Sequence, residues 1–133
     1  MFKTILFPID RSRDSQEAAE TVANLVKFCH SRLIILSVQE EAGAETSGEG
    51  LTPVMVEQLL ETARTAFTEW GIEVETLRRQ GKPAFMICDV ADEIKADLIV
   101  MGCRGIGLTQ EGAAESVSNR VINLAPCPVL IVP

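Results

Sequence analysis

The chain has 133 residues, 47% of them hydrophobic and 23% charged, which predicts one globular domain over residues 1–133. Its formal net charge of −7, with no Lys/Arg cluster, argues against nucleic acid and against membrane surfaces as partners. No apolar run approaches the roughly 20 residues of a membrane span, and Pro8 and Asp10 interrupt the first apolar run, so we expect no secretory signal and a cytoplasmic protein.

The first half of the chain alternates short apolar runs with helical patterns. Lys3–Ile9 and Arg32–Val38 are nearly continuous apolar runs, as expected for strands that are buried on both faces. Between them, Asp14 and Glu17 predict a capped helix start, and apolar residues then recur at helical spacing. Gln39–Gly50 contains four glutamates and no Lys or Arg, which predicts a mobile acidic loop.

The second half repeats this alternation. A helix is predicted from Pro53 to Trp70, and Gly71 is free to adopt the left-handed conformation that ends it. Ile72–Leu77 alternates apolar and polar residues and predicts an edge strand, followed by a polar connection. The remaining predicted elements are a helix over Pro83–Ile94, a strand over Leu98–Met101, a helix whose apolar face includes Val121, Ile122 and Leu124, and a strand over Val129–Val132.

Five strands alternating with four helices predict an α/β fold, a Rossmann-like doubly wound parallel sheet with right-handed crossovers. The expected strand order is 3-2-1-4-5, in which the winding reverses between the first and fourth strands. Such sheets bind ligands outside the carboxyl ends of their strands at that reversal. Asp10 follows the first strand and Gly102 the fourth, so both are expected to line one crevice. A carboxylate and a glycine-rich loop can hold a ribose hydroxyl and a phosphate, although a glycine-rich loop can also simply turn the chain.

The cysteines and the single histidine give weaker signals. Cys29, Cys88, Cys103 and Cys127 form no CxxC pair, so neither a zinc site nor thioredoxin-type chemistry is indicated. We expect reduced thiols, with Cys29 and Cys88 in the core, and Cys103 in the glycine-rich loop as the candidate for reactivity. His30 ends a helical pattern, where a cation suits the helix dipole, and no partner for a metal or catalytic role is evident.

Three stretches form a specific pattern: KTILFPID at the N-terminus, ADLIVMGCRG, and ESVSNRVINLAPCPVLIVP at the C-terminus. Together with RLIILSV they resemble the universal stress protein family over essentially the whole chain. The resemblance implies a Rossmann-like five-stranded domain and usually a homodimer. In the family the dimer commonly forms through the last strand, which here consists of Val129, Leu130, Ile131 and Val132.

Family members that bind ATP have Gly-x-x-Gly, nine residues, then Gly and Ser or Thr. Gly102–Gly105 matches the first part, and nine residues later Glu115 stands where the motif has glycine. The resemblance implies a ribose contact for Asp10, a backbone contact to adenine for Val38, and ATP or AMP as ligand, with Mg²⁺. The nucleotide-binding positions that it implies are Pro8, Ile9, Asp10, Val38, Met101, Gly102, Arg104, Gly105, Glu115, Ser116, Val117 and Ser118.

Glu115 is the departure with the clearest physical consequence. A glycine would expose its N–H to a phosphate, whereas glutamate adds bulk and a negative charge. Two like charges about 4 Å apart cost roughly 1 to 4 kcal/mol, depending on how wet the site is. We therefore expect nucleotide binding that is weak or shifted towards AMP or another ligand with less phosphate charge. Arg11, often glycine in the family, is a second departure.

Three function classes remain. The first is a dimeric, nucleotide-responsive stress protein that acts as a binding module. The second is the same fold acting only through contacts with an unknown protein partner, which Glu115 favours. The third is a slow ATPase or phosphotransferase, which is the least supported because no P-loop lysine follows the glycines. Receiver domains and ATP-pyrophosphatases share the architecture, but Arg78–Gln80 and Asp10–Ser12 replace the residues that their chemistry needs.

Overall fold

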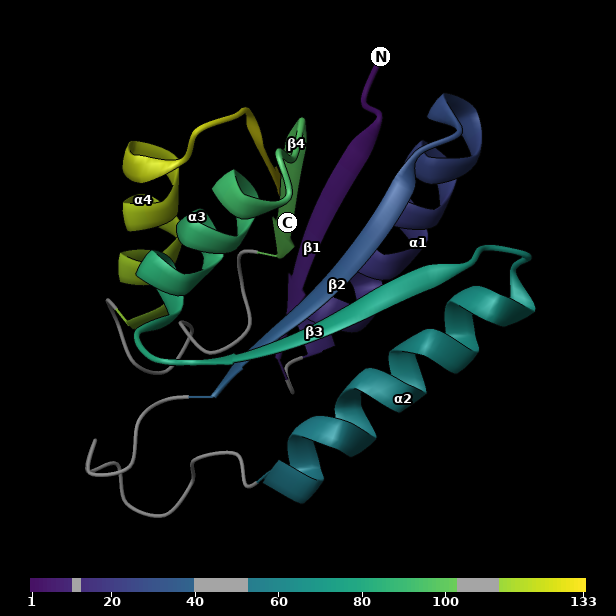
Figure 1. The fold of residues 1–133 in the computed structure, drawn as a ribbon, viewed down its shortest axis with the longest axis horizontal. Helices are drawn as coiled ribbons and strands as arrows, with labels where there is room; N and C mark the ends of the chain where they lie inside the picture. The colour runs from purple at the N-terminus through teal and green to yellow at the C-terminus, as the bar shows by residue number, and fades with distance from the viewer. Residues whose placement is uncertain (11–12, 40–52, 103–112) are drawn as a thin grey trace.

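The computed structural model describes residues 1–10, 13–39, 53–102 and 113–133 (Figure 1). The predicted acidic loop, Gln39–Gly50, lies almost entirely outside these residues. The described elements are β1 (Thr4–Ile9), α1 (Arg13–Cys29), β2 (Arg32–Gln39), α2 (Pro53–Glu69), β3 (Val74–Gln80), α3 (Pro83–Glu93), β4 (Leu98–Gly102), α4 (Ala113–Leu124) and β5 (Val129–Val132). Their order confirms the predicted alternation of strands and helices.

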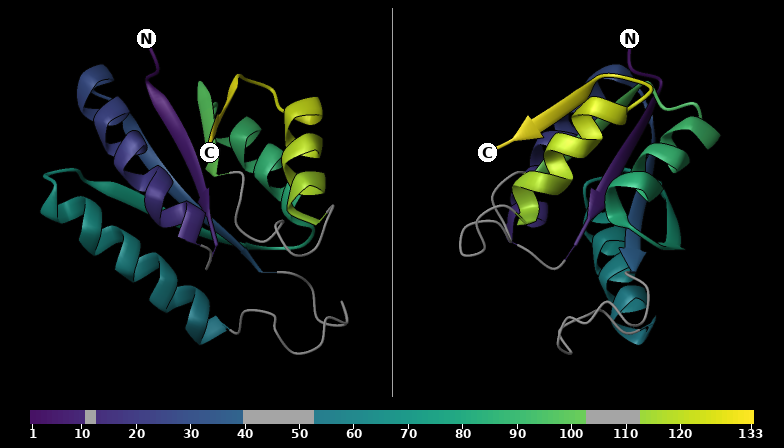
Figure 2. Two further views of the ribbon diagram at one scale, coloured as in Figure 1. Left: turned by 180° about the vertical axis from the view of Figure 1, so that it is seen from behind. Right: turned by 90° about the vertical axis from the view of Figure 1, so that its left-hand side faces the viewer.

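The strands form one parallel sheet in the order β3-β2-β1-β4-β5, as predicted. Helices α1 and α2 cover one face and α3 and α4 cover the other (Figures 1 and 2). Two cores result, because successive strand residues point to opposite faces. In β1, Ile5 and Phe7 pack in the α1–α2 layer, whereas Leu6 packs in the α3–α4 layer. Among the described helices, none is long and apolar enough to cross a membrane.

The turn after α2 confirms the role predicted for Gly71, whose φ is +81°. The Ile72 N–H donates to the Phe67 carbonyl at 2.9 Å, and the Gly71 N–H donates to the Thr68 carbonyl at 2.9 Å. This pair of bonds is the Schellman motif, which satisfies carbonyls that the end of a helix leaves without partners.

The predicted bounds of the third strand are wrong. The sequence pattern predicts Ile72–Leu77, but β3 begins at Val74 and continues to Gln80, where it still pairs with Gln39. The polar residues at its end remain paired with β2, and the two arginines among them each form an ion pair with a glutamate of a helix. Arg78 Nη1 lies 3.2 Å from Glu57 Oε2 of α2. Arg79 Nη2 lies 3.1 Å from Glu93 Oε1 of α3.

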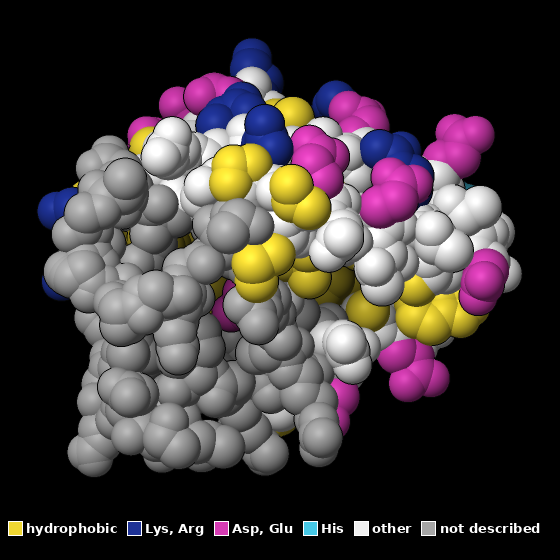
Figure 3. Space-filling model, turned by 90° about the horizontal axis from the view of Figure 1, so that it is seen from below, with side chains coloured by type: hydrophobic (Ala, Val, Ile, Leu, Met, Phe, Trp, Pro, Cys, Tyr) yellow, Lys and Arg dark blue, Asp and Glu magenta, His cyan; other side chains and the backbone are white. Residues whose placement is uncertain are grey.

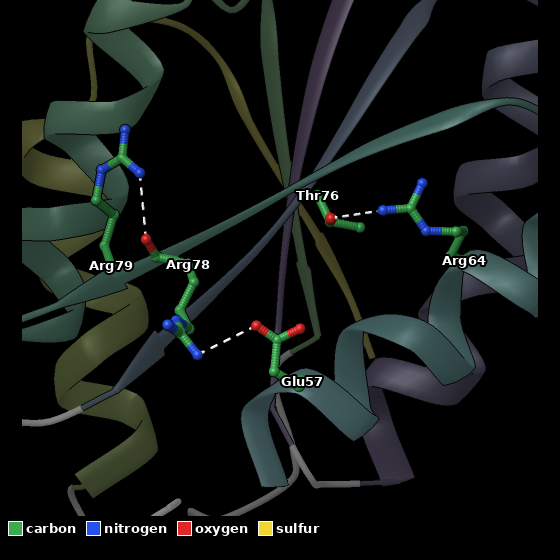
Figure 4. A network of polar contacts seen from close by, with 5 residues as sticks. All are labelled: Glu57, Arg64, Thr76, Arg78 and Arg79. Atoms are coloured by element: carbon green, nitrogen blue, oxygen red, sulfur yellow. Dashed lines mark hydrogen bonds and ion pairs between the residues drawn. The ribbon is translucent and has the colours of Figure 1, made fainter. Parts of the chain in front are cut away.

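Figure 4 shows how α2 is held against this edge strand. The Arg64 guanidinium on α2 donates to the Thr76 hydroxyl at 2.9 Å, and Arg78 reaches back to Glu57. Arg79 also donates to the carbonyl of Arg78 at 3.2 Å. Charged side chains of this kind blunt a sheet edge that would otherwise pair with another chain.

The last helix differs from the apolar face expected for it. Its backbone is helical from Ala113, so residues 115–118 lie within its first turns. Val121 is fully buried, but Ile122 is 51% and Leu124 is 49% exposed, so the three do not share one buried face. The start of α1 at Arg13 likewise puts Asp14 inside the helix rather than at its cap.

Candidate functional site

The candidate site lies at the carboxyl edge of the sheet, where β1 and β4 are neighbours. The chain winds outward in opposite directions from this pair, because β2 and β3 lie on one side and β5 on the other. Asp10 directly follows β1, and Gly102 is the last residue of β4. The structure therefore brings to the same edge the carboxylate and the first glycine of the loop that the sequence singles out.

Pro8 limits the pairing of β1 with β4 at this edge. Alternate residues of a parallel strand direct their backbone groups to opposite neighbours, and the Thr4 carbonyl accepts the Asp97 N–H of the β4 side at 2.7 Å. Even-numbered residues of β1 therefore face β4, and Pro8 has no N–H to donate. The register with β4 ends at Leu6, whereas the register with β2 continues to Ile9. The ladder thus stops where a doubly wound sheet binds its ligands.

The opposite end of the same strand pair is tied together by Asp97. Its Oδ2 accepts the Lys3 N–H at 3.0 Å and the Thr4 N–H at 2.9 Å. The Asp97 carboxylate thus accepts hydrogen bonds from two backbone N–H groups at the start of β1. The backbone N–H of Asp97 in turn donates to the Thr4 carbonyl. This clamp joins β1 to β4 at the edge of the sheet opposite to the candidate site.

The side chains predicted to line the site belong to different layers. Val38 and Met101 pack with the α3–α4 core, and Met101 is 8% exposed. Ile9 packs in the α1–α2 core, so the Ile9 side chain lies on the other face of the sheet. Pro8 and Asp10 are half-buried at the end of β1. A ligand over the α3–α4 face can therefore meet Val38 and Met101, but only the backbone of Ile9.

The phosphate side of the predicted site is described only in part. Arg104 and Gly105 lie outside the described residues. Glu115, Ser116 and Ser118 are described as backbone of α4, and Val117 is half-buried against the α3–α4 core. The first four N–H groups of a helix have no partner within it. The N–H groups of residues 113–116 therefore have no partner within α4, and the partial positive charge of the helix end favours an anion there.

Figure 3 views the molecule from the carboxyl edge. Hydrophobic side chains gather in the middle of the described face, and charged side chains lie towards its rim. Arg78 and Arg79 end β3 near this edge, but both are already ion-paired with glutamates. Within the described ranges, no three His, Cys, Asp or Glu side chains group as a metal site would require.

Ser37 is a buried polar residue that the sequence analysis did not single out, and it lies on the α1–α2 face of the sheet, opposite to Val38 and Met101. It lies opposite Ile9 near the carboxyl end of β2, and it shares the face of Ile35. Its side chain is fully buried, and within the described part of the chain its Oγ has no hydrogen-bond partner. The signal in the sequence that could have identified Ser37 is its position as a hydroxyl residue within the apolar run of the second strand. An unpartnered buried hydroxyl lowers stability.

The chain matches known proteins over its full length. The model of the universal stress protein family matches residues 1–133. The universal stress protein Sll1654 of Synechocystis sp. is 58% identical, and the alignment covers all of this chain and 87% of that protein.

Solved structures share the fold. A universal stress protein in complex with cAMP has a TM-score of 0.80 and 22% identity, covering 99% of this chain and 97% of that chain. The universal stress protein from Archaeoglobus fulgidus in complex with dAMP has a TM-score of 0.75 and 23% identity, covering 99% of this chain and 98% of that chain. At this level of identity the likeness concerns the architecture.

Proposed function

Because the chain belongs to the universal stress protein family, we propose that residues 1–133 act as one domain that binds an adenine nucleotide between β1 and β4. One observation carries the proposal: Asp10 directly follows β1 and Gly102 ends the neighbouring β4, beyond the point where the β1–β4 ladder has stopped. The fold neighbours solved with cAMP and dAMP support the choice of ligand class. The domain works as a binding module that reports nucleotide to a protein partner.

Each part of the nucleotide has a proposed contact. Asp10 accepts hydrogen bonds from ribose hydroxyls, and the Val38 backbone meets the adenine edge, with Met101 beside it. The phosphate lies between Gly102 and the first turn of α4, where backbone N–H groups are available. The remaining proposed positions are Pro8, Ile9, Arg104, Gly105, Ser116, Val117 and Ser118.

Glu115 selects which nucleotide binds best. It occupies the first turn of α4, the part of the helix that favours an anion. Its carboxylate competes with phosphate oxygens for that turn and repels each further phosphate charge. We therefore propose that AMP binds more tightly than ATP, and that Mg²⁺ reduces the difference by neutralising the polyphosphate.

The test is calorimetric titration of nucleotide-free protein with AMP and ATP, for wild type, Glu115→Gln and Glu115→Gly. A repulsion of about 1 to 4 kcal/mol corresponds to a gain in ATP affinity of about fivefold to several hundredfold. Glu115→Gln removes the charge and keeps the size, so it should recover most of that gain, and AMP should gain less than ATP. Tight ATP binding by wild type that neither variant improves would contradict the role of Glu115. Absence of binding by all three would favour the family's fold acting through protein contacts alone.

We further propose a homodimer through β5. This strand, Val129–Val132, is an edge of the sheet (Figure 2). Leu130 is 38% exposed. The half-exposed Ile122 and Leu124 lie on the helix just before it. Light scattering should give the mass of a dimer for wild type, and Leu130→Lys should shift it towards the monomer at micromolar concentration. A monomeric wild type would overturn this part of the proposal.

A further inference from the structure

Two thiols from distant parts of the sequence, Cys88 and Cys127, pack in the α3–α4 layer near the C-terminal end of α4. Cys88 lies on α3, and its Sγ is 4.0 Å from the Val121 carbonyl of α4. The same carbonyl accepts the Ala125 N–H at 2.8 Å, and Cys127 follows two residues later, just before β5. Both thiols are half-buried and pack against the same core. Both therefore approach the C-terminal end of α4.

The electrostatics of the two thiols agree with this proximity. The pKa of Cys127 is raised mainly by burial, and further by the nearby Asp97 and by Cys88 itself. The pKa of Cys88 is raised mainly by burial and also by Asp89. Both groups are therefore protonated thiols near neutral pH. Because the thiolate is the reactive form, each reacts slowly with oxidants.

We propose that Cys88 and Cys127 form a reversible intramolecular disulfide under sustained exposure to a hydroperoxide. One thiolate attacks a peroxide oxygen, which breaks the O–O bond and yields a sulfenic acid, with the leaving oxygen released as water after protonation. The second thiolate attacks the sulfenic sulfur, forms the S–S bond and displaces hydroxide, which is protonated to a second water. Overall, two thiols and one hydrogen peroxide give one disulfide and two waters.

The position of the pair gives the disulfide a structural consequence. The loop that it closes contains β4, the segment after Gly102, and α4. The bond joins α3 to the entry of β5, so it constrains the part of the chain that carries the phosphate side of the proposed nucleotide site. Closing a loop of about 40 residues is expected to raise Tm by roughly 10 °C, since the unfolded chain loses freedom. Formation of the bond does not depend on the nucleotide proposal.

The experiment uses the full chain with Cys29→Ser and Cys103→Ser, so that Cys88 and Cys127 are its remaining cysteines. The folded protein is treated with hydrogen peroxide, quenched, and its thiols are counted in denaturant. The titre is expected to fall from two per chain to none. Trypsin digestion should release a linked peptide pair containing Cys88 and Cys127, and dithiothreitol should restore both thiols. Unfolding of the oxidised and reduced forms should show the rise in Tm.

Matched variants separate the proposal from general oxidation. Adding Cys127→Ser should abolish both the linked peptides and the rise in Tm, whereas the chain with Cys29→Ser alone should retain both. The proposal is overturned if the folded chain keeps both thiols until it is unfolded. It is also overturned if peroxide yields sulfinic acids, or a bond between two chains, in place of the intramolecular disulfide.

Discussion

Removal of the Asp97 carboxylate should destabilise the protein measurably. Asp97 Oδ2 accepts the backbone N–H groups of Lys3 and Thr4 at 3.0 and 2.9 Å. A hydrogen bond to a charged group contributes about 1.5–3 kcal/mol. The bond to Lys3 is exposed, so water can replace it, whereas the bond to Thr4 is partly buried. We therefore expect Asp97→Ala to cost about 2 kcal/mol, most of it from Thr4.

The assay is urea unfolding followed by circular dichroism, with stability taken from the midpoint and slope. Asp97→Asn keeps a carbonyl acceptor and loses the charge, so it should cost about half as much as Asp97→Ala. Glu20→Ala, on the exposed side of α1, serves as the matched surface control and should stay within about 0.5 kcal/mol of wild type. If Asp97→Ala also stays within that range, the carboxylate does not hold β1 against β4.

Three further predictions concern a buried hydroxyl, a glycine and an ion pair. Ser37→Ala should leave stability unchanged or raise it by up to about 1 kcal/mol in urea unfolding, because the fully buried Oγ has no partner in the described chain; a loss above that size would reveal a bond. Gly81→Ala should cost about 1–3 kcal/mol in the same assay, because φ is +148° and a Cβ would lie 3.1 Å from Met86 Cγ; an unchanged midpoint would contradict this. The hydrogen bond from Arg32 lowers the pKa of Glu75 in the folded protein. The stability that this pair contributes is therefore present at pH values above the pKa that Glu75 has in the unfolded chain, and it is lost as the pH falls through the lower pKa of the folded state. The small Tm difference between wild type and Glu75→Gln should therefore vanish on acidification, and a difference that grows there would refute the assignment.

The strands buried on both faces were predictable because a continuous run of apolar residues in the local sequence indicates them. Each residue from Leu33 to Leu36 is apolar, and each is at most 1% exposed in the structure. The edge strand β3 was harder to bound, since Arg78 and Arg79 are polar along the sequence. Their partners, Glu57 and Glu93, come from helices on opposite faces of the sheet, and no local pattern contains such contacts.

The candidate site was predictable where it depends on topology. Asp10 follows β1 and Gly102 is the last residue of β4, and the strand order alone brings them to one edge. The features that the sequence did not predict depend on three-dimensional neighbours. Within the described residues the buried Ser37 Oγ has no hydrogen-bond partner, and Cys88 reaches the Val121 carbonyl because α3 lies against α4. The spacing of residues along the sequence predicts neither the missing partner of Ser37 nor the surroundings of Cys88.

The central claim, an adenine-nucleotide site at the carboxyl edge between β1 and β4, is tested most directly by NMR. A ¹⁵N-labelled, nucleotide-free sample is titrated with AMP, and the backbone amide shifts are followed residue by residue. The account predicts saturable shifts for Asp10, Val38 and Gly102, with little change for Thr4 and Arg32 at the opposite edge of the sheet. Shifts confined to the opposite edge, or none at millimolar AMP, would contradict it.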